Sequence, residues 1–250
     1  MARPDDDDGD TSTAPDSIAM TDLASIAYGL IVKLHIAAGC VALIAFWTAG
    51  LARKSRGGLH VKAGAIYLAA MRGILLTGLP MALAAFVRGQ PAQGVFLSYL
   101  VVLVATTVFI APRAVRHKQD FAAFRSGGYR FYAVLLPMAA TASLGYGLNT
   151  GNLLLIGFAS VGFTVGFGMW RNIRRATPAA GWWLKEHYGA MIGNGVGTHI
   201  AFLAIGLSRV LPKDYANTVQ LLAWFGPLSL AVIATVVLNR RYRQRQVLAA

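Results

Sequence analysis

Seven long runs of apolar residues, separated by short polar connections, dominate the sequence. They cover residues 29–51, 63–87, 94–112, 131–148, 152–170, 188–208 and 219–238. A helix that crosses a membrane needs roughly 20 predominantly apolar residues, and each run is close to that length. Only the turn residues Asn149, Thr150 and Gly151 separate the fourth run from the fifth, which predicts an antiparallel hairpin. We therefore predict an all-α integral membrane protein, a bundle of about seven transmembrane helices.

The composition indicates that the protein is surrounded partly by lipid, and it divides the chain into three segments. Of its 250 residues, 56% are hydrophobic and 13% are charged, and the mean hydropathy is +0.54. Most of its 10 acidic residues lie within the first 22 positions, beside Ser, Thr, Pro and Gly, a composition that cannot bury a core. We expect a disordered acidic tail over residues 1–22, the transmembrane domain over 23–239 and a basic tail over 240–250.

The basic residues alternate between the two sides of the predicted bundle. Lysine and arginine concentrate in the first, third and fifth connections and after the last run, whereas the other connections hold few. The positive-inside rule then places the N-terminus outside and the C-terminus in the cytoplasm, as in a multipass protein of a bacterial inner membrane. Because the net charge of +13 comes from these short clusters, we expect the lipid bilayer as partner and no nucleic acid.

Two histidines stand at the cytoplasmic start of predicted helices, His60 on the second and His187 on the sixth, and therefore at matched depth. Bis-histidine ligation of a b-type haem needs imidazoles from two helices in that arrangement. His35 lies near the outer end of the first helix, and His199 lies about 18 Å beyond His187 along the axis. We predict haem b held by His60 and His187, a second haem between His35 and His199, and no other metal site.

Arg72 is the most costly residue of the predicted membrane region. It lies near the bilayer centre on the second helix, where an arginine costs roughly 2.5–3.5 kcal/mol, so we expect it to face the bundle interior with a partner. None of the seven runs contains an aspartate or glutamate. The expected partners are polar protein groups or an anion that is not protein, such as the haem propionates.

A series of small residues on the sixth run predicts a packing surface. Gly189, Gly193 and Gly197 recur at every fourth position, which places them on one side of a helix. Such a series allows the backbone of a neighbouring helix to approach closely.

Two stretches, residues 34–71 and 185–212, resemble a family of uncharacterised bacterial multipass membrane proteins known only by a domain-of-unknown-function label. The matching positions are His35 and Gly39, then His60, Gly64 and Tyr67, and finally His187, Met191 and Ile192. The family's usual arginine and tryptophan near the last motif are here Gly193 and Ala190. The resemblance implies the membrane fold and a role for the three histidines, but it implies no reaction.

These residues favour a membrane redox or electron-transfer protein that binds b-type haem, and they leave alternatives open. One is a transporter or lipid-binding protein for an anionic solute, with Arg72 as its charge clamp. Another is a non-catalytic accessory or assembly subunit that contacts other membrane-protein subunits. A metal-dependent hydrolase would have to use His35, His60 and His187 without a carboxylate companion. Whether the protein is an enzyme stays open.

Overall fold

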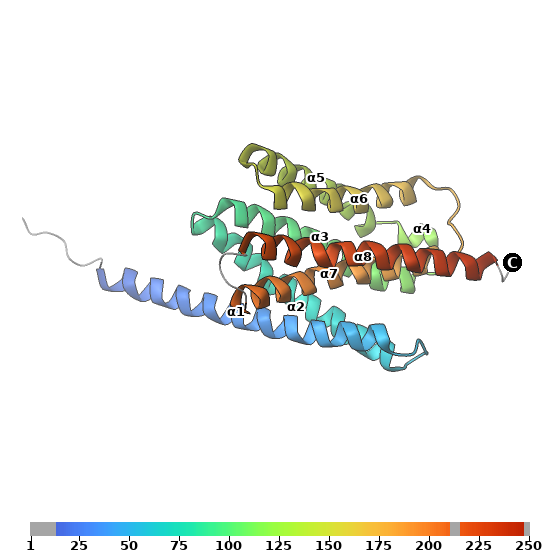
Figure 1. Cartoon of the computed structure of the whole chain (residues 1–250), viewed down its shortest axis with the longest axis horizontal. Helices are drawn as coiled ribbons and strands as arrows, with labels where there is room; N and C mark the ends of the chain where they lie inside the picture. The colour runs from blue at the N-terminus through green and yellow to red at the C-terminus, as the bar shows by residue number, and fades with distance from the viewer. Residues whose placement is uncertain (1–13, 211–215, 248–250) are drawn as a thin grey trace, which may run out of the picture.

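The computed structural model describes the backbone of residues 14–210 and 216–247 and the side chains of residues 23–204 and 221–242. Within these ranges the chain is helical, with no strand. The eight helices are α1 (Ala14–Leu51), α2 (Leu59–Val87), α3 (Pro91–Arg116), α4 (Phe121–Phe124), α5 (Gly128–Thr150), α6 (Leu153–Arg174), α7 (Trp182–Val210) and α8 (Ala216–Val247). All but the single-turn α4 run roughly along one direction (Figure 1).

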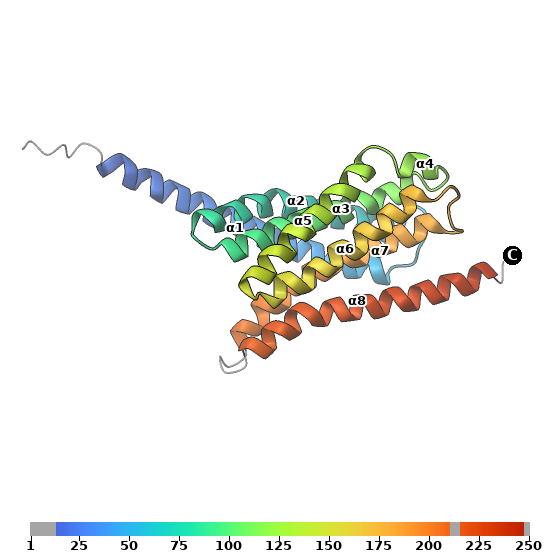
Figure 2. The ribbon, with the colours of Figure 1, turned by 90° about the horizontal axis from the view of Figure 1, so that it is seen from above.

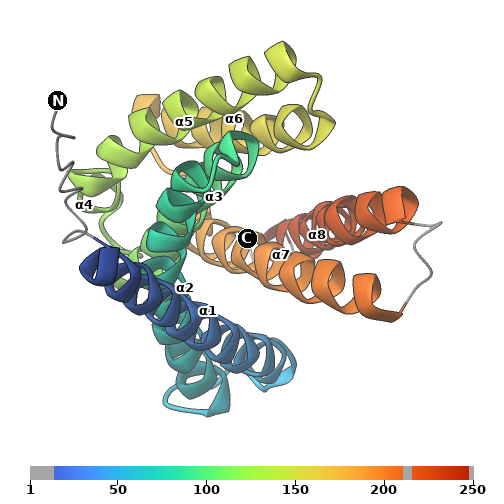
Figure 3. The ribbon, with the colours of Figure 1, turned by 90° about the vertical axis from the view of Figure 1, so that its left-hand side faces the viewer.

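Three helix pairs surround α3. Along the bundle axis, α1 and α2 lie on one side of α3, α5 and α6 on another, and α7 and α8 on a third (Figure 3). Helix α3 contacts the near member of each pair, α2, α5 and α7, while α8 lies at an edge and packs on α7 (Figure 2). Helix α3 is therefore the hub that fixes the positions of the other helices.

Within the part of the chain that the structure describes, six helices are long and apolar enough to cross a membrane. The spans are Leu23–Leu51, Leu59–Val87, Pro91–Arg116, Gly128–Thr150, Leu153–Arg174 and Leu221–Tyr242. Large apolar side chains stay exposed on the outer faces of these helices, including Leu76, Val87, Phe167 and Leu230. A monomer in water rarely exposes so much contiguous apolar surface. The protein is thus a multipass membrane protein built as a helical bundle.

The helices follow the apolar runs, but several extend further than predicted. Helix α1 begins at Ala14, inside the segment expected to be a disordered tail, and α8 continues to Val247 through most of the predicted basic tail. Residues 1–13 and 248–250 lie outside the described residues. A helix that is already nucleated grows by one hydrogen bond per added residue, so polar flanks can continue it. The predicted fourth-to-fifth hairpin is present: Gly151 ends α5 in the left-handed conformation and the Asn152 side chain caps α6.

Two glycines of α6 allow close helix packing, whereas the ends of the predicted glycine series of α7 do not. A Cβ atom at Gly189 or Gly197 would meet nothing within 4 Å. On α6, by contrast, a Cβ at Gly162 would lie 2.9 Å from Ala140 Cβ, and one at Gly166 would lie 2.6 Å from Pro137 Cγ. These two glycines are one turn apart and let α5 approach α6 closely.

Candidate functional site

Four helices enclose the predicted haem-binding histidines. Helices α1 and α2, α2 and α3, α3 and α7, and α7 and α1 are in contact, so the four form a ring. Helices α2 and α7 face each other across its interior, where the Thr198 hydroxyl lies 3.7 Å from Met71 Sδ. Small buried side chains of α1, Ala42, Ala45 and Ala49, line the same interior. Helical bundles build cofactor sites in such interiors, from side chains on facing helices.

His60 and His187 lie side by side at one end of this four-helix ring. Their ring centroids are 6.5 Å apart and their planes make an angle of 79°. The Nδ1–H of His60 donates to the Ala49 carbonyl of α1 at 2.9 Å. That of His187 donates to the Ala111 carbonyl of α3, also at 2.9 Å. Each ring is thereby fixed in the tautomer that leaves Nε2 with its lone pair.

The two free nitrogens suit one metal ion placed between the rings. Two histidines from facing helices, each with an Nε2 lone pair, are the ligand set that a b-type haem would use, and their rings lie 6.5 Å apart. Among the described residues, no three His, Cys, Asp or Glu side chains group to hold a metal. A metal bound here would therefore have to carry most of its own ligands, as haem iron does.

Two unpartnered polar groups lie two turns deeper on the same helix faces. Tyr67 follows His60 by seven residues and Asn194 follows His187 by seven, which places both about 10 Å further along the helices. Both side chains are fully buried, and within the described residues Tyr67 Oη and Asn194 Nδ2 have no hydrogen-bond partner. Asn194 Oδ1 accepts from the Thr107 hydroxyl at 2.6 Å, which directs its amide nitrogen elsewhere. Both unpartnered atoms can donate, so they fit an acceptor such as a haem carboxylate.

A small residue leaves space beside the histidine pair. Gly64, one turn after His60, has no atom within 4 Å of the position where a Cβ would lie. The residues present in the ring therefore fit a haem group by ligand number, spacing and donors.

A partly buried carboxyl group, that of Glu186, belongs to the α7 residue just before His187. The Asn172 amide of α6 donates to Glu186 Oε1 at 2.8 Å and to the Tyr129 hydroxyl at 3.1 Å. Glu186 lies outside the six membrane-spanning helices, where burial raises the pKa of its carboxyl and the Asn172 hydrogen bond opposes that shift. The contacts tie α5, α6 and α7 together at the end that holds His187.

The structure does not bring His35 and His199 together. His35 Nδ1 lies 2.8 Å from the Thr77 hydroxyl oxygen of α2. His199 instead contacts α1 at Trp47, whose indole N–H donates to His199 Nε2 at 2.9 Å, while His199 Nδ1 pairs with the Gly195 carbonyl at 2.7 Å. Trp47 is about 18 Å from His35 along α1. The structure therefore gives no support to a second haem between His35 and His199, because both ring nitrogens of His199 have other partners and α7 meets α1 near Trp47, far from His35.

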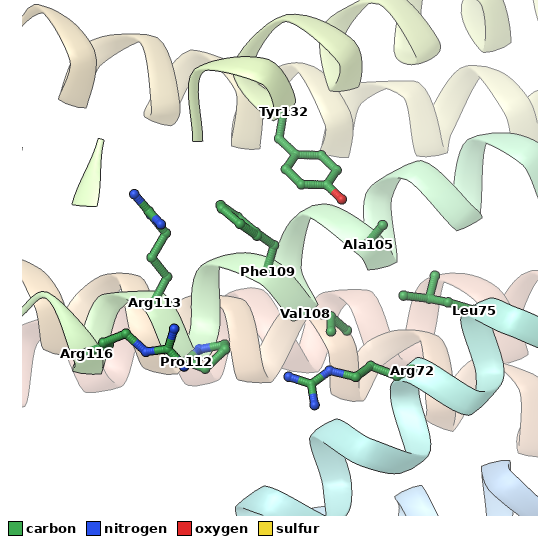
Figure 4. A pocket seen from close by; sticks show the side chains of 9 residues that line it. All are labelled: Arg72, Leu75, Ala105, Val108, Phe109, Pro112, Arg113, Arg116 and Tyr132. Atoms are coloured by element: carbon green, nitrogen blue, oxygen red, sulfur yellow. The ribbon is translucent and has the colours of Figure 1, made fainter. Parts of the chain in front are cut away.

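Arg72 does not face the bundle interior, contrary to the prediction. Its neighbours on α2, Tyr67 and Met71, occupy the interior face, and the step of about 100° per residue turns Arg72 outward. The exposed Arg72 instead lines a pocket between α2, α3 and α5 (Figure 4). No histidine lines this pocket, so it gives no support to the expected pairing of Arg72 with haem propionates.

Several of these residues were not singled out from the sequence. Trp47 carried no signal, because a tryptophan near a helix end is ordinary in membrane proteins. Arg113 and Arg116, which share the pocket of Arg72, were interpreted only as topology signals. The spacing of seven residues places Tyr67 on the helix face of His60 and Asn194 on that of His187, but only the packing of the helices shows that their donor atoms are unpartnered.

No family model, curated protein or solved structure matches this chain. The resemblance of residues 34–71 and 185–212 to an uncharacterised membrane family accordingly stays a prediction.

Proposed function

We propose that the protein is a membrane redox protein that binds one b-type haem between His60 and His187. The pairing of their rings at 6.5 Å, on helices that face each other across a four-helix ring, carries the proposal. When bound, the haem iron would supply one-electron oxidation and reduction. No second haem is proposed, since His35 and His199 have other partners.

The protein's own contribution is to orient the two imidazoles and to fix which ring nitrogen carries the hydrogen. The Ala49 and Ala111 carbonyls each accept an Nδ1–H, which fixes both rings and raises the electron density at Nε2. These acceptors belong to α1 and α3, so all four helices of the ring position the ligands. Tyr67 and Asn194 would donate hydrogen bonds at the inner side.

The topology proposed for this function has seven spans in a bacterial inner membrane. Helix α7 coincides with the predicted run 188–208 and is as long as α2, and it runs along the spanning helices (Figure 1). Its polar residues, such as Asn194 and Thr198, are buried against neighbouring helices. With α7 included, the number of spans is odd, so the N-terminus lies outside and the basic C-terminus in the cytoplasm. The histidine pair then lies near the cytoplasmic surface, within reach of a donor or acceptor on that side.

Absorption spectra of the protein purified in detergent, oxidised and then dithionite-reduced, test the proposal. We expect a Soret band and sharp reduced α and β bands that are lost in His60→Ala and in His187→Ala. His117→Ala is the matched control, because His117 lies in the third connection, away from the pair. His199→Ala should also keep the bands.

Two results would contradict a haem site here. One is a colourless protein after expression with ample haem. The other is a spectrum that survives in both His60→Ala and His187→Ala.

A further inference from the structure

We propose that the pocket around Arg72 binds the phosphate headgroup of an anionic phospholipid from the cytoplasmic leaflet. The proposal does not depend on haem. The pocket has a volume of about 300 Å³ and lies between α2, α3 and α5, with Arg72, Pro112, Arg113 and Arg116 among its lining residues (Figure 4).

The positive charge of the pocket favours an anionic ligand. Three of its nine lining residues are arginines and none is acidic. Arg113 is partly engaged, because its Nε donates to the Phe124 carbonyl at 2.7 Å and holds the third connection in place. Within the described residues, Arg72 and Arg116 hydrogen bond to no protein group, and both are exposed. Their side chains point toward one another from α2 and α3 across Pro112 (Figure 4).

The position of Arg72 makes a lipid the fitting source of that anion. Arg72 belongs to a membrane-spanning helix and faces outward, where an unpaired guanidinium is costly. Its guanidinium is directed back toward Arg116, which ends α3, and so toward the headgroup region (Figure 4). Basic pockets between helices on the cytoplasmic side bind anionic headgroups in this way.

An apolar stripe continues from the pocket along α2. Leu76, Leu79 and Leu83 follow Arg72 at four, seven and eleven residues, so they share its face, and all three are exposed. A phosphate held by Arg72 and Arg116 would leave its acyl chains against this stripe. A free phosphate ion would gain nothing from it, and this difference favours the lipid.

Lipid binding to the purified full-length protein tests the site. We would titrate phosphatidylglycerol, phosphatidylcholine and inorganic phosphate separately, and measure retained lipid by native mass spectrometry and the melting temperature by fluorescence. We expect saturable retention of phosphatidylglycerol with a rise in melting temperature, weaker retention of phosphatidylcholine, and no effect of inorganic phosphate. Arg72→Gln and Arg116→Gln should each weaken phosphatidylglycerol binding about five- to tenfold. Arg56→Gln, the same charge change in the exposed first connection, should not.

Each control separates the lipid site from another explanation. Stabilisation by inorganic phosphate equal to that by phosphatidylglycerol would overturn the lipid source, and equal retention of the two lipids would overturn the need for a net anion. If Arg72→Gln does not fold, Arg116→Gln at the end of α3 and the lipid comparison on the unmodified protein still decide the matter. Retention should persist in His60→Ala, whereas its loss there would assign the arginines to the histidine site.

Discussion

Replacing Gly166 by alanine would insert a methyl group at the closest approach between α5 and α6. The new Cβ would lie 2.6 Å from Pro137 Cγ, a ring atom that cannot rotate away because the ring closes on the α5 backbone. Gly162→Ala would place its Cβ 2.8 Å from Tyr99 Oη and 2.9 Å from Ala140 Cβ. Carbon atoms in favourable contact are about 3.5–4.0 Å apart, so the helices would have to separate by roughly 1 Å in both variants.

Overpacking of this kind costs about 1–3 kcal/mol. For a chain of this size, that loss lowers the melting temperature by roughly 2–12 °C. Gly162→Ala should lie toward the upper end, because displacing Tyr99 also disturbs its hydrogen bond to the Phe158 carbonyl, 2.6 Å long. Gly168 provides the matched control on the same helix: nothing lies within 4 Å of its Cβ position, so Gly168→Ala should be neutral or stabilising by up to about 1 kcal/mol.

The assay is thermal unfolding in one detergent, followed by tryptophan fluorescence, for the three variants and the unmodified protein. The expected order of melting temperatures is Gly168→Ala highest, then Gly166→Ala, then Gly162→Ala. Equal melting temperatures for Gly166→Ala and Gly168→Ala would refute the close packing of α5 on α6.

Two further predictions concern hydrogen bonds. Trp47→Phe removes the indole N–H that donates to His199 Nε2 and should lower the free energy of unfolding by roughly 0.5–1.5 kcal/mol, measured by the same unfolding assay. No loss would mean that the Trp47–His199 hydrogen bond contributes nothing to stability. Tyr99→Phe should lower stability by a similar amount, about 0.5–1.5 kcal/mol, because it removes the hydrogen bond to the Phe158 carbonyl; unchanged stability in the same assay would contradict a contribution from that hydrogen bond.

The positions of the helices could be predicted from the sequence because each apolar run is bounded by polar or turn residues. Gly151 and Asn152 mark the junction of α5 and α6 in the sequence, and in the structure Gly151 ends α5 and Asn152 caps α6. The matched depth of His60 and His187 was predicted because both stand at the cytoplasmic start of an apolar run, and the structure places the two rings side by side. Whether they bind haem stays a prediction.

The outward direction of Arg72 could not be predicted, because α2 is apolar on nearly every side. When apolar residues surround a helix, their spacing does not distinguish the face toward lipid from the face toward the other helices. Met71 occupies the interior face of α2, so Arg72, the next residue, faces away from the interior. The pairing of His35 with His199 could not be tested by counting residues for a related reason. Such a count gives equal depths only for helices with the same tilt, and the angle at which α7 crosses α1 depends on side-chain packing. Gly195, where a Cβ would lie 2.4 Å from the Phe46 ring, permits that crossing.

The separation of His60 and His187 along the chain has a consequence for biogenesis. His60 enters the membrane with the second helix, but His187 is synthesised more than a hundred residues later, which takes the ribosome roughly 6–25 s at about 5–20 residues per second. During that time the Ala49 carbonyl can already hold His60, whereas the facing ligand does not exist. Helix α7 then brings two buried polar residues, Asn194 and Thr198, whose contacts with Thr107 and Met71 form only with helices that are already inserted. The nascent chain thus acquires a complete pair of imidazoles in one late step, and any cofactor they hold must be loaded after it.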